Sequence, residues 1–182
     1  MIRVLDFLAA FFGLLILWPV LLVVTIIGIF DTGSPIFVQE RVGRNKKPFK
    51  LIKFRTMSVE TKSVASHLAN NASITKLGAF LRKTKIDELP QLINVVKGEM
   101  SLVGPRPNLF NQEELIKERD ALGVYDVLPG VTGLAQVQNI DMSTPALLAQ
   151  TDKQMIDSLT VKDYFKYIMM TVTGSGSGDA VK

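Results

Sequence analysis

Residues 8–30 read L-A-A-F-F-G-L-L-I-L-W-P-V-L-L-V-V-T-I-I-G-I-F and contain no charged side chain. A helix of this length crosses the roughly 30 Å hydrocarbon core of a bilayer. The apolar run is too long for the core of a secretory signal, and no small-residue cleavage site follows it. The stretch therefore predicts a membrane helix, and one transmembrane span is its simplest form.

Two features of this segment fit a simple span poorly. Pro19 follows Trp18 in mid-segment, where it removes a backbone donor and kinks a helix. Both flanks are also basic, with Arg3 before the segment and a basic cluster within residues 41–55 after it, as is typical of cytoplasmic flanks. A re-entrant helix that bends at Pro19 and leaves on the same face satisfies both observations. The residues alone leave the span as the default.

Composition places the chain among single-domain, membrane-associated proteins. It has 182 residues, of which 47% are hydrophobic, and its mean hydropathy of +0.25 is high for a freely soluble chain. There is no cysteine, which excludes a disulfide framework and a thiolate nucleophile. His67 is the only histidine and lies in a polar region, so a histidine-dependent hydrolase or a histidine-ligated zinc site has little support.

Much of the net charge of +4 comes from one short run. The basic residues of this run are Arg41, Arg44, Lys46, Lys47, Lys50, Lys53 and Arg55. Because the run follows a membrane segment, anionic lipid or a membrane-bound phosphate is a better partner than nucleic acid. No zinc-finger or RNP motif occurs, so we expect no nucleic-acid partner.

The remaining chain alternates short strand-like and helix-like segments. Apolar runs at 36–38 and 49–54 around a turn at 43–45 predict a small β-hairpin. Spacing and caps predict helices over residues 74–83, 111–122, 145–158 and 160–172, with weaker helical character at 58–72. Residues 129–133 read as a tight loop, residues 134–137 as a brief strand, and residues 174–182 as a flexible tail. The fold class is therefore α+β and mostly helical.

Adjacent carboxylates open the stretch D-E-L-P-Q-L-I-N-V-V-K-G-E-M-S-L-V-G-P-R-P at residues 87–107. Pro90 is tolerated only in a first helical turn, so Asp87 is the expected helix N-cap, with Glu88 beside it. The positive end of the helix dipole would favour an ionised carboxylate and a nearby phosphate. Acids at helix starts commonly only cap, so the pair by itself does not establish a site.

Nearby cations give the acid pair a chemical context. Pyrophosphate bonds are attacked most easily when their oxygens bind a divalent metal and several cations, and a carboxylate nucleophile then forms a phosphoryl-enzyme. The flanking prolines restrict the backbone of Arg106, whose structural alternative is a turn in which it pairs with Glu99. The candidate phosphate-binding cations are Lys53, Arg55, Arg82 and Arg106.

Four motifs in this order resemble the bacterial sugar transferases, the monotopic phosphoglycosyl transferases that act on polyprenyl phosphate. They are P-I-F-V-Q at 35–39, K-F-R-T-M at 53–57, I-D-E-L-P-Q-L-I-N-V-V-K-G-E-M-S-L-V-G-P-R-P at 86–107 and P-G-V-T-G-L-A-Q-V at 129–137. The family pattern also has a basic residue and an Asp near its start, matched by Arg3 and Asp6. The resemblance covers nearly the whole chain and is closest to the minimal catalytic form.

The resemblance implies a fold and a location. Residues 1–30 would form a re-entrant membrane helix, residues 31–173 a catalytic domain, and residues 174–182 a tail. The amphipathic helices at 74–83 and 160–172 would lie at the interface, although periodicity fits ordinary core packing equally well. The protein would sit on the cytoplasmic face of the bacterial inner membrane, with a homodimer left open.

The resemblance also implies a reaction. Asp87 would be the nucleophile that takes a phosphosugar from a UDP-sugar with release of UMP, and Glu88 would bind Mg²⁺. Lys53, Arg82 and Arg106 would contact phosphate, and undecaprenyl phosphate would accept the phosphosugar to begin an O-antigen, capsule or exopolysaccharide. The rival interpretation is a non-catalytic, membrane-anchored scaffold that binds lipid phosphate and uses the acid pair only as a cap.

One position departs from the family pattern. Many members carry a basic residue just before the P-G-[IV]-T-G loop, where this chain has Leu128. Either one substrate-binding cation is missing or Arg119 replaces it from the preceding helix. Asp141 and Asp152 could be ligands, but solvated surface acids are the default expectation for both.

Overall fold

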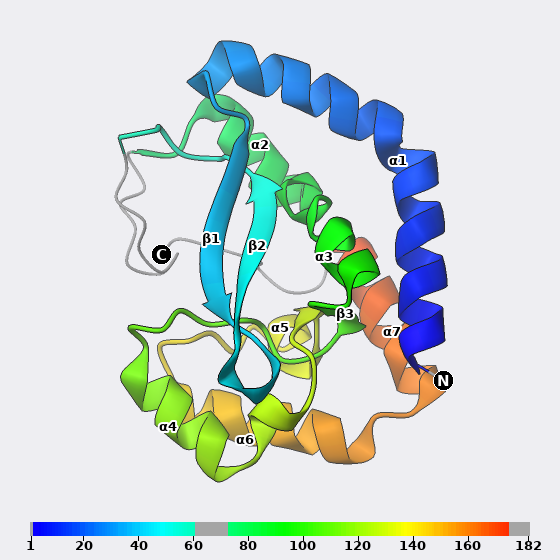
Figure 1. The fold of residues 1–182 in the computed structure, drawn as a ribbon, viewed down its shortest axis with the longest axis vertical. Helices are drawn as coiled ribbons and strands as arrows, with labels where there is room; N and C mark the ends of the chain where they lie inside the picture. The colour runs from blue at the N-terminus through cyan, green and yellow to red at the C-terminus, as the bar shows by residue number, and fades with distance from the viewer. Residues whose placement is uncertain (1, 61–72, 175–182) are drawn as a thin grey trace.

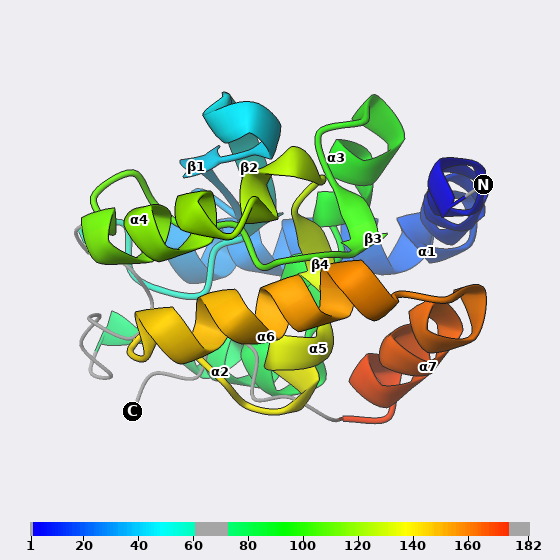
Figure 2. The same cartoon turned by 90° about the horizontal axis from the view of Figure 1, so that it is seen from below.

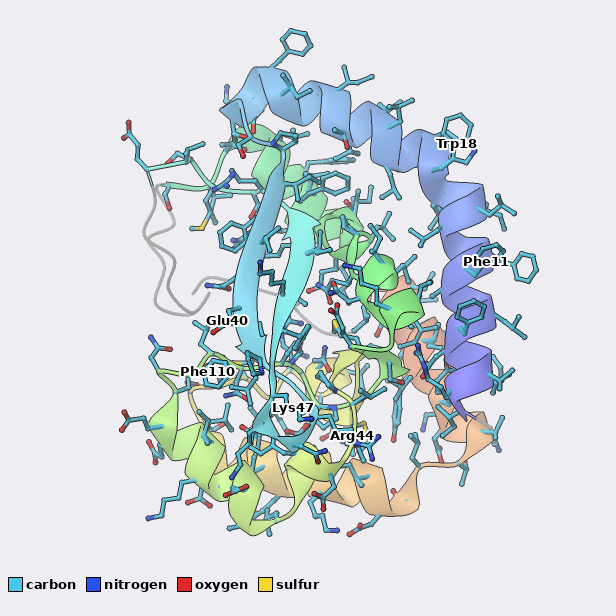
Figure 3. All side chains as sticks on the ribbon, in the orientation of Figure 1. Phe11, Trp18, Glu40, Arg44, Lys47 and Phe110 are labelled. Carbon is cyan, nitrogen blue, oxygen red and sulfur yellow. The ribbon has the colours of Figure 1, made fainter. Side chains whose placement is uncertain are left out.

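The computed structural model describes residues 2–60 and 73–174. Its longest element is α1 (Ile2–Thr32), which continues through Pro19 without a break in the helix. Figure 1 shows that α1 arches around one side of the molecule and changes direction about halfway along, near Trp18 as labelled in Figure 3. Within residues 2–60 and 73–174, α1 is the one helix long and apolar enough to cross a membrane.

The predicted hairpin is confirmed and is longer than expected. Strands β1 (Ile36–Val42) and β2 (Pro48–Phe54) pair antiparallel, with Phe37 opposite Lys53, around the short turn η1 (Arg44–Lys46). The predicted first strand covers only residues 36–38, and Gln39, Glu40 and Arg41 follow it. Those residues continue the strand because they alternate, with Gln39 and Arg41 buried and Glu40 exposed.

The helices predicted before and after the acid pair Asp87–Glu88 are both present. Helix α2 (Lys76–Thr84) begins at Thr75, whose hydroxyl accepts a hydrogen bond from the Gly78 amide at 2.9 Å. The short turn η4 (Ile86–Glu88) and helix α3 (Gln91–Lys97) follow, and α3 ends at Gly98 with φ 87°.

The predictions of a tight loop at 129–133 and of a strand at 134–137 are both wrong. Residues 129–133 contain strand β4 (Gly130–Thr132), which pairs parallel with β3 (Ser101–Val103), and the expected strand at 134–137 is helix α5 (Leu134–Val137). A four-residue apolar run does not distinguish helix from strand. The strand pairing depends on close contact with a distant segment, since a Cβ at Gly130 would lie 2.1 Å from the Gly104 nitrogen.

The predicted C-terminal helices are confirmed as α4 (Glu113–Ala121), α6 (Pro145–Ser158) and α7 (Val161–Val172). The turn η5 (Val124–Asp126) follows α4. Seen from below in Figure 2, α6 crosses the base of the molecule between α4 and α7. The weak helix expected at 58–72 lies mostly outside the described residues, as do His67 and nearly all of the expected tail.

The inner face of helix α1 packs against the rest of the fold. Ala10 packs in one core cluster with Phe49, Leu51, Val95 and Met100. Farther along α1, Val24 packs against Phe54 and Leu81. The predicted domain boundary at residue 30 stays a prediction. The residues before and after this boundary pack together in a common core.

Buried polar contacts fix the N-terminal end of α1. The carboxylate of Asp6, 1% exposed, accepts hydrogen bonds from the Ser101 hydroxyl (3.0 Å), the Leu102 amide (2.9 Å) and the Tyr164 hydroxyl (2.9 Å). Arg3 donates to the Val96 and Met100 carbonyls, both at 3.3 Å, close to the C-terminal end of α3. The acid that the family pattern places near its start therefore ties α1 to β3 and α7.

The outer face of α1 is apolar and exposed. Phe11 and Trp18 point away from the body of the molecule in Figure 3. Their large apolar neighbours on α1 with at least two fifths of their surface exposed are Val4, Phe7, Leu8, Phe12, Leu15, Ile16, Leu22, Val23, Ile26, Ile27, Ile29 and Phe30. Soluble monomers rarely expose a contiguous apolar surface of this extent.

Candidate functional site

The acid pair lies in η4, between α2 and α3. Asp87 and Glu88 are only 3% and 8% exposed. The expectation that Asp87 caps a helix is wrong. The N-cap of α3 is Pro90, without a side-chain hydrogen bond, because the chain has already turned helically through Ile86–Glu88 and Leu89. A burial this deep without a capping role needs another explanation, since buried carboxylates are costly unless partnered.

Asn94 sets the position of α3 against the hairpin. Its side chain is fully buried and accepts a hydrogen bond from the Ile52 amide (3.1 Å). It also donates to the Lys50 carbonyl (2.7 Å) and to the Glu99 carboxylate (2.6 Å). These bonds join α3 to β2, which brings η4 against the same strand.

Arg106 pairs with Glu88 and not with Glu99. Its Nη2 lies 2.7 Å from Glu88 Oε1, and the two side chains are 20% and 9% exposed. The pair joins the G-P-R-P turn to η4 across 18 residues of sequence. This largely desolvated guanidinium provides a fixed positive charge at Glu88, the residue next to the candidate nucleophile Asp87.

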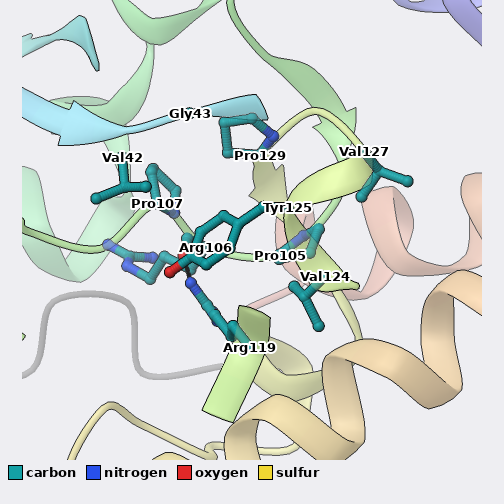
Figure 4. A pocket seen from close by; sticks show the side chains of 10 residues that line it. All are labelled: Val42, Gly43, Pro105, Arg106, Pro107, Arg119, Val124, Tyr125, Val127 and Pro129. Carbon is teal, nitrogen blue, oxygen red and sulfur yellow. Dashed lines mark hydrogen bonds between the residues drawn. The ribbon is translucent and has the colours of Figure 1, made fainter. Parts of the chain in front are cut away.

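Two buried arginines hold the backbone around Arg106. Arg119 in α4 donates to the Arg106 carbonyl at 2.8 Å, and Arg41 in β1 donates to the Pro107 carbonyl at 3.1 Å. Figure 4 shows Arg119 reaching the Arg106–Pro107 segment with the ring of Tyr125 beside it. The cation in the turn is therefore positioned by contacts from two sides as well as by its flanking prolines.

The Arg119 side chain belongs to an internal network. It is 1% exposed and pairs with Asp152 at 2.7 Å, and it also donates to Asn108 Oδ1 at 3.0 Å. Tyr125 donates to the same Asn108 oxygen at 3.0 Å, and burial raises the pKa of its phenol. The expectation that Asp152 is a solvated surface acid is wrong, because it is 1% exposed and compensates the charge of Arg119. These contacts give Arg119 a supporting role beneath Arg106 and not that of a substitute at position 128.

The three other predicted cations lie on or next to the elements that contact η4. Lys53 on β2 is 7% exposed, with its ammonium 5.7 Å from the Phe37 ring centroid. Arg55 lies 5.3 Å from the same ring and donates to the Ser34 carbonyl at 2.8 Å. Both β2 and α2 pack against η4, so the segments that carry Lys53 and Arg82 lie beside the acid pair.

Arg82 lies at the end of α2, and its position is fixed by the close contact of α2 with the K-F-R-T-M segment. Its Nε donates to the Thr56 hydroxyl at 2.8 Å. A Cβ at Gly78 would lie 2.0 Å from the Thr56 carbonyl oxygen, so only glycine lets α2 approach K-F-R-T-M this closely.

The basic cluster at 41–55 divides into two groups in the structure. Arg41 and Lys53 are buried and face inward. Arg44, Lys46, Lys47 and Lys50 are exposed at or near the hairpin tip, where Figure 3 labels Arg44 and Lys47 well away from Trp18 on α1. Arg55 is half-buried and belongs to neither group, and of the four exposed residues Lys46 pairs with Asp120 at 2.8 Å.

Sequence reasoning missed Lys85, the residue two places before Asp87. It is half-buried, and burial and the charge of Arg106 lower the pKa of its ammonium while Glu88 acts in the opposite direction. The sequence feature that could have identified Lys85 is its position immediately before the I-D-E motif.

The donor set is compatible with magnesium that binds together with a substrate. Among residues 2–60 and 73–174, no cluster of three or more His, Cys, Asp or Glu side chains could hold a metal ion. Mg²⁺ commonly uses one or two carboxylates and completes its octahedron with waters and substrate phosphates. Asp87 and Glu88 offer such hard oxygen donors on consecutive residues.

Comparison with known proteins places the chain in a family. The family model described as "Bacterial sugar transferase" matches residues 1–176. The chain is 39% identical over 171 residues to the uncharacterized sugar transferase EpsL of Bacillus subtilis, covering 93% of this chain and 84% of that protein.

Two longer relatives extend the comparison. The uncharacterized sugar transferase of Haemophilus influenzae is 42% identical over 163 residues, covering 78% of this chain and 34% of that protein. The UDP-glucose:undecaprenyl-phosphate glucose-1-phosphate transferase of Klebsiella pneumoniae is 35% identical over 180 residues, covering 93% and 39%. The chain thus spans little more than a third of these two relatives. With a match that runs through α1, the acid pair and α7, this chain belongs to the bacterial sugar transferase family.

Proposed function

We propose that this protein transfers a sugar 1-phosphate from a UDP-sugar to undecaprenyl phosphate, releases UMP, and so begins the synthesis of an O-antigen, capsule or exopolysaccharide. The observation that carries the proposal is the buried Asp87–Glu88 pair, in which Glu88 binds Arg106 at 2.7 Å on a rigidly supported turn. Relatives named as undecaprenyl-phosphate sugar-1-phosphate transferases, such as that of Klebsiella pneumoniae, support the substrate class.

The reaction would proceed in two displacements at one phosphorus atom. In the first, a carboxylate oxygen of Asp87 attacks the β-phosphorus of the UDP-sugar, and the bond to the bridging oxygen breaks so that UMP leaves with the electron pair. In the second, a phosphate oxygen of undecaprenyl phosphate attacks the same phosphorus. Asp87 is then released as a carboxylate, and the product is undecaprenyl diphosphate sugar.

The surrounding charges would stabilise the transferring phosphoryl group. Arg106, Arg82 and Lys53, with Arg55 at the edge, would bind phosphate oxygens and the charge that develops on the leaving phosphate. Arg106 would also hold the Glu88 carboxylate in a fixed orientation. Glu88, with the substrate diphosphate, would hold Mg²⁺, which when bound supplies Lewis-acid neutralisation of the phosphate oxygens.

The acceptor is a lipid, which gives α1 a role. Its exposed apolar face would lie in the bilayer and its bend at Pro19 would return the chain to the same surface, so the site faces the interface. We place the protein on the cytoplasmic face of the bacterial inner membrane, since both flanks of α1 are basic.

The test is UMP release from a panel of UDP-sugars by the purified protein in lipid nanodiscs with Mg²⁺ and undecaprenyl phosphate. Release with at least one sugar, abolished in Asp87→Asn but retained in Asp157→Asn, is expected, because Asp157 is an exposed acid paired only with Lys153 on the surface. A chelator should stop release and added Mg²⁺ should restore it. Wild-type turnover by Asp87→Asn would refute the proposed nucleophile.

The scaffold interpretation predicts a different result from the same assay. A scaffold would bind undecaprenyl phosphate and release no UMP with any sugar. The scaffold interpretation also explains the acid pair as a helix cap. The structure does not support this explanation, because Asp87 does not cap α3.

A further inference from the structure

Lys85 has a backbone conformation that lysine rarely adopts. Its φ and ψ are 58° and 15°, in the left-handed region, where a Cβ is unfavourable and glycine or asparagine is preferred. The residue joins two elements, because its amide donates to the Arg82 carbonyl and its carbonyl accepts from the Glu88 amide, both at 3.2 Å. Such conformations persist where the surrounding structure imposes them and are frequent at functional sites.

The side chain of Lys85 joins η4 to the end of α7. Its ammonium donates to the Thr171 carbonyl at 3.4 Å, near the C-terminal end of α7. It also lies close enough to Glu88 and Arg106 for both charges to shift its pKa. At 3.4 Å this bond is longer than the bond of Arg82 to Thr56 at 2.8 Å and that of Arg106 to Glu88 at 2.7 Å.

We infer that Lys85 is a further substrate-binding cation, which binds the diphosphate of the donor alongside Arg82 and Arg106. This inference rests on the proposed function. Lysine is a flexible point charge that suits the changing geometry of a transferring phosphoryl group, whereas Arg82 and Arg106 are each fixed by a short bond, to Thr56 at 2.8 Å and to Glu88 at 2.7 Å. The Thr171 carbonyl would hold the ammonium near the site until phosphate oxygens replace it.

A purely structural role is the alternative. A cation at the C-terminal end of a helix stabilises its last carbonyls, and Lys85 would then only fasten α7. The two roles differ in whether loss of the ammonium changes phosphate binding or only stability.

The unusual backbone of Lys85 allows a clean experiment. Lys85→Gly removes the ammonium and suits the left-handed conformation, so the fold should be retained. Lys85→Arg keeps the charge, and Lys83→Met removes a charge of the same sign from an exposed position two residues away. The readouts are the Kd of labelled UDP by equilibrium dialysis on nanodisc protein with Mg²⁺, the KM for the UDP-sugar, and the Tm.

The expected result is a loss of UDP affinity and a rise in donor KM of about 10- to 100-fold in Lys85→Gly, the range for a charge-assisted hydrogen bond. Lys85→Arg should stay within about threefold of wild type, and Lys83→Met should be unchanged. Wild-type UDP affinity and KM in Lys85→Gly would overturn the inference and leave the proposed function standing. A lower Tm with unchanged UDP affinity would overturn it in favour of the structural tie. Failure of the wild type itself to bind UDP and release UMP would overturn both.

Discussion

The placement of a single charge, that of Arg106, explains why Glu88 can remain buried. Taking a carboxylate out of water is costly unless a cation or hydrogen bond compensates it. Glu88 has that compensation from Arg106, and the burial in turn strengthens the field that acts on any phosphate in the site. The pairing connects a predicted metal ligand with a predicted phosphate contact.

The geometry of the Arg106–Glu88 pair predicts that a lysine at position 106 cannot replace arginine, although both side chains carry a positive charge. Arg106→Lys keeps the charge but loses the planar fork that reaches Glu88 and a phosphate together. We expect kcat/KM for UMP release to fall about 10- to 100-fold with little change in Tm. Arg44→Lys at the exposed hairpin tip is the matched control and should behave as wild type. A rate for Arg106→Lys equal to that control would argue against a positioning role for the guanidinium.

Among the elements, β1 and α4 matter for the support they give to the G-P-R-P turn. Arg41 and Arg119 reach this turn from β1 and α4, and each donates to a backbone carbonyl beside Arg106. The fully buried charge of Arg119 is in turn compensated by Asp152 on α6. The stability of this network and the position of Arg106 should therefore be coupled.

Breaking one side of the Arg119–Asp152 pair should be costly. Arg119→Met leaves an uncompensated buried carboxylate and should lower the free energy of unfolding by about 3–5 kcal/mol, measured by denaturant titration. The double variant Arg119→Met/Asp152→Leu removes both charges and should recover most of that loss. UMP release should remain impaired in the double variant, because the Arg106 carbonyl still lacks its donor. Equal stability of the single and double variants would contradict this account.

The N-terminus of α7 predicts a pH dependence of stability. Thr160 and Asp163 form a capping box, and the hydrogen bond from the Thr160 hydroxyl lowers the pKa of Asp163 below its ordinary value of 3.8. A lowered pKa means that the contribution is complete above the unfolded pKa and is lost as pH falls through the folded one. The Tm difference between wild type and Asp163→Asn should therefore be present at pH 7 and vanish in strong acid. A difference that persists unchanged in strong acid would show that ionisation is irrelevant to this cap.

At the scale of the whole molecule, α1 packs its inner face on the core and leaves its outer face exposed and apolar. A helix that spans a bilayer as an isolated anchor would not need the buried Asp6 contacts with Ser101, Leu102 and Tyr164. The bend seen in Figure 1 and these anchors favour a helix that stays attached to the body of the protein at both ends.

Labelling of single cysteines can test the re-entrant arrangement, because the natural chain has none. A cysteine added ahead of Met1, before α1, and Lys50→Cys, at an exposed position after α1, report on the two ends of this helix. In inner-membrane vesicles of known orientation, a membrane-impermeant maleimide should label both from the cytoplasmic face. Labelling from opposite faces would establish a transmembrane span instead.

What the sequence by itself determined was local. The apolar run at 8–30, the hairpin, the helices that became α2, α4, α6 and α7, and the acid pair were all readable, because periodicity and capping depend on neighbouring residues. Only the tertiary structure decided the β3–β4 pairing, the contact of Arg106 with Glu88, the burial of Asp152 against Arg119 and the left-handed backbone of Lys85. These features join segments far apart in the chain or depend on a strained backbone, and no local pattern encodes which distant charge will be desolvated beside which partner.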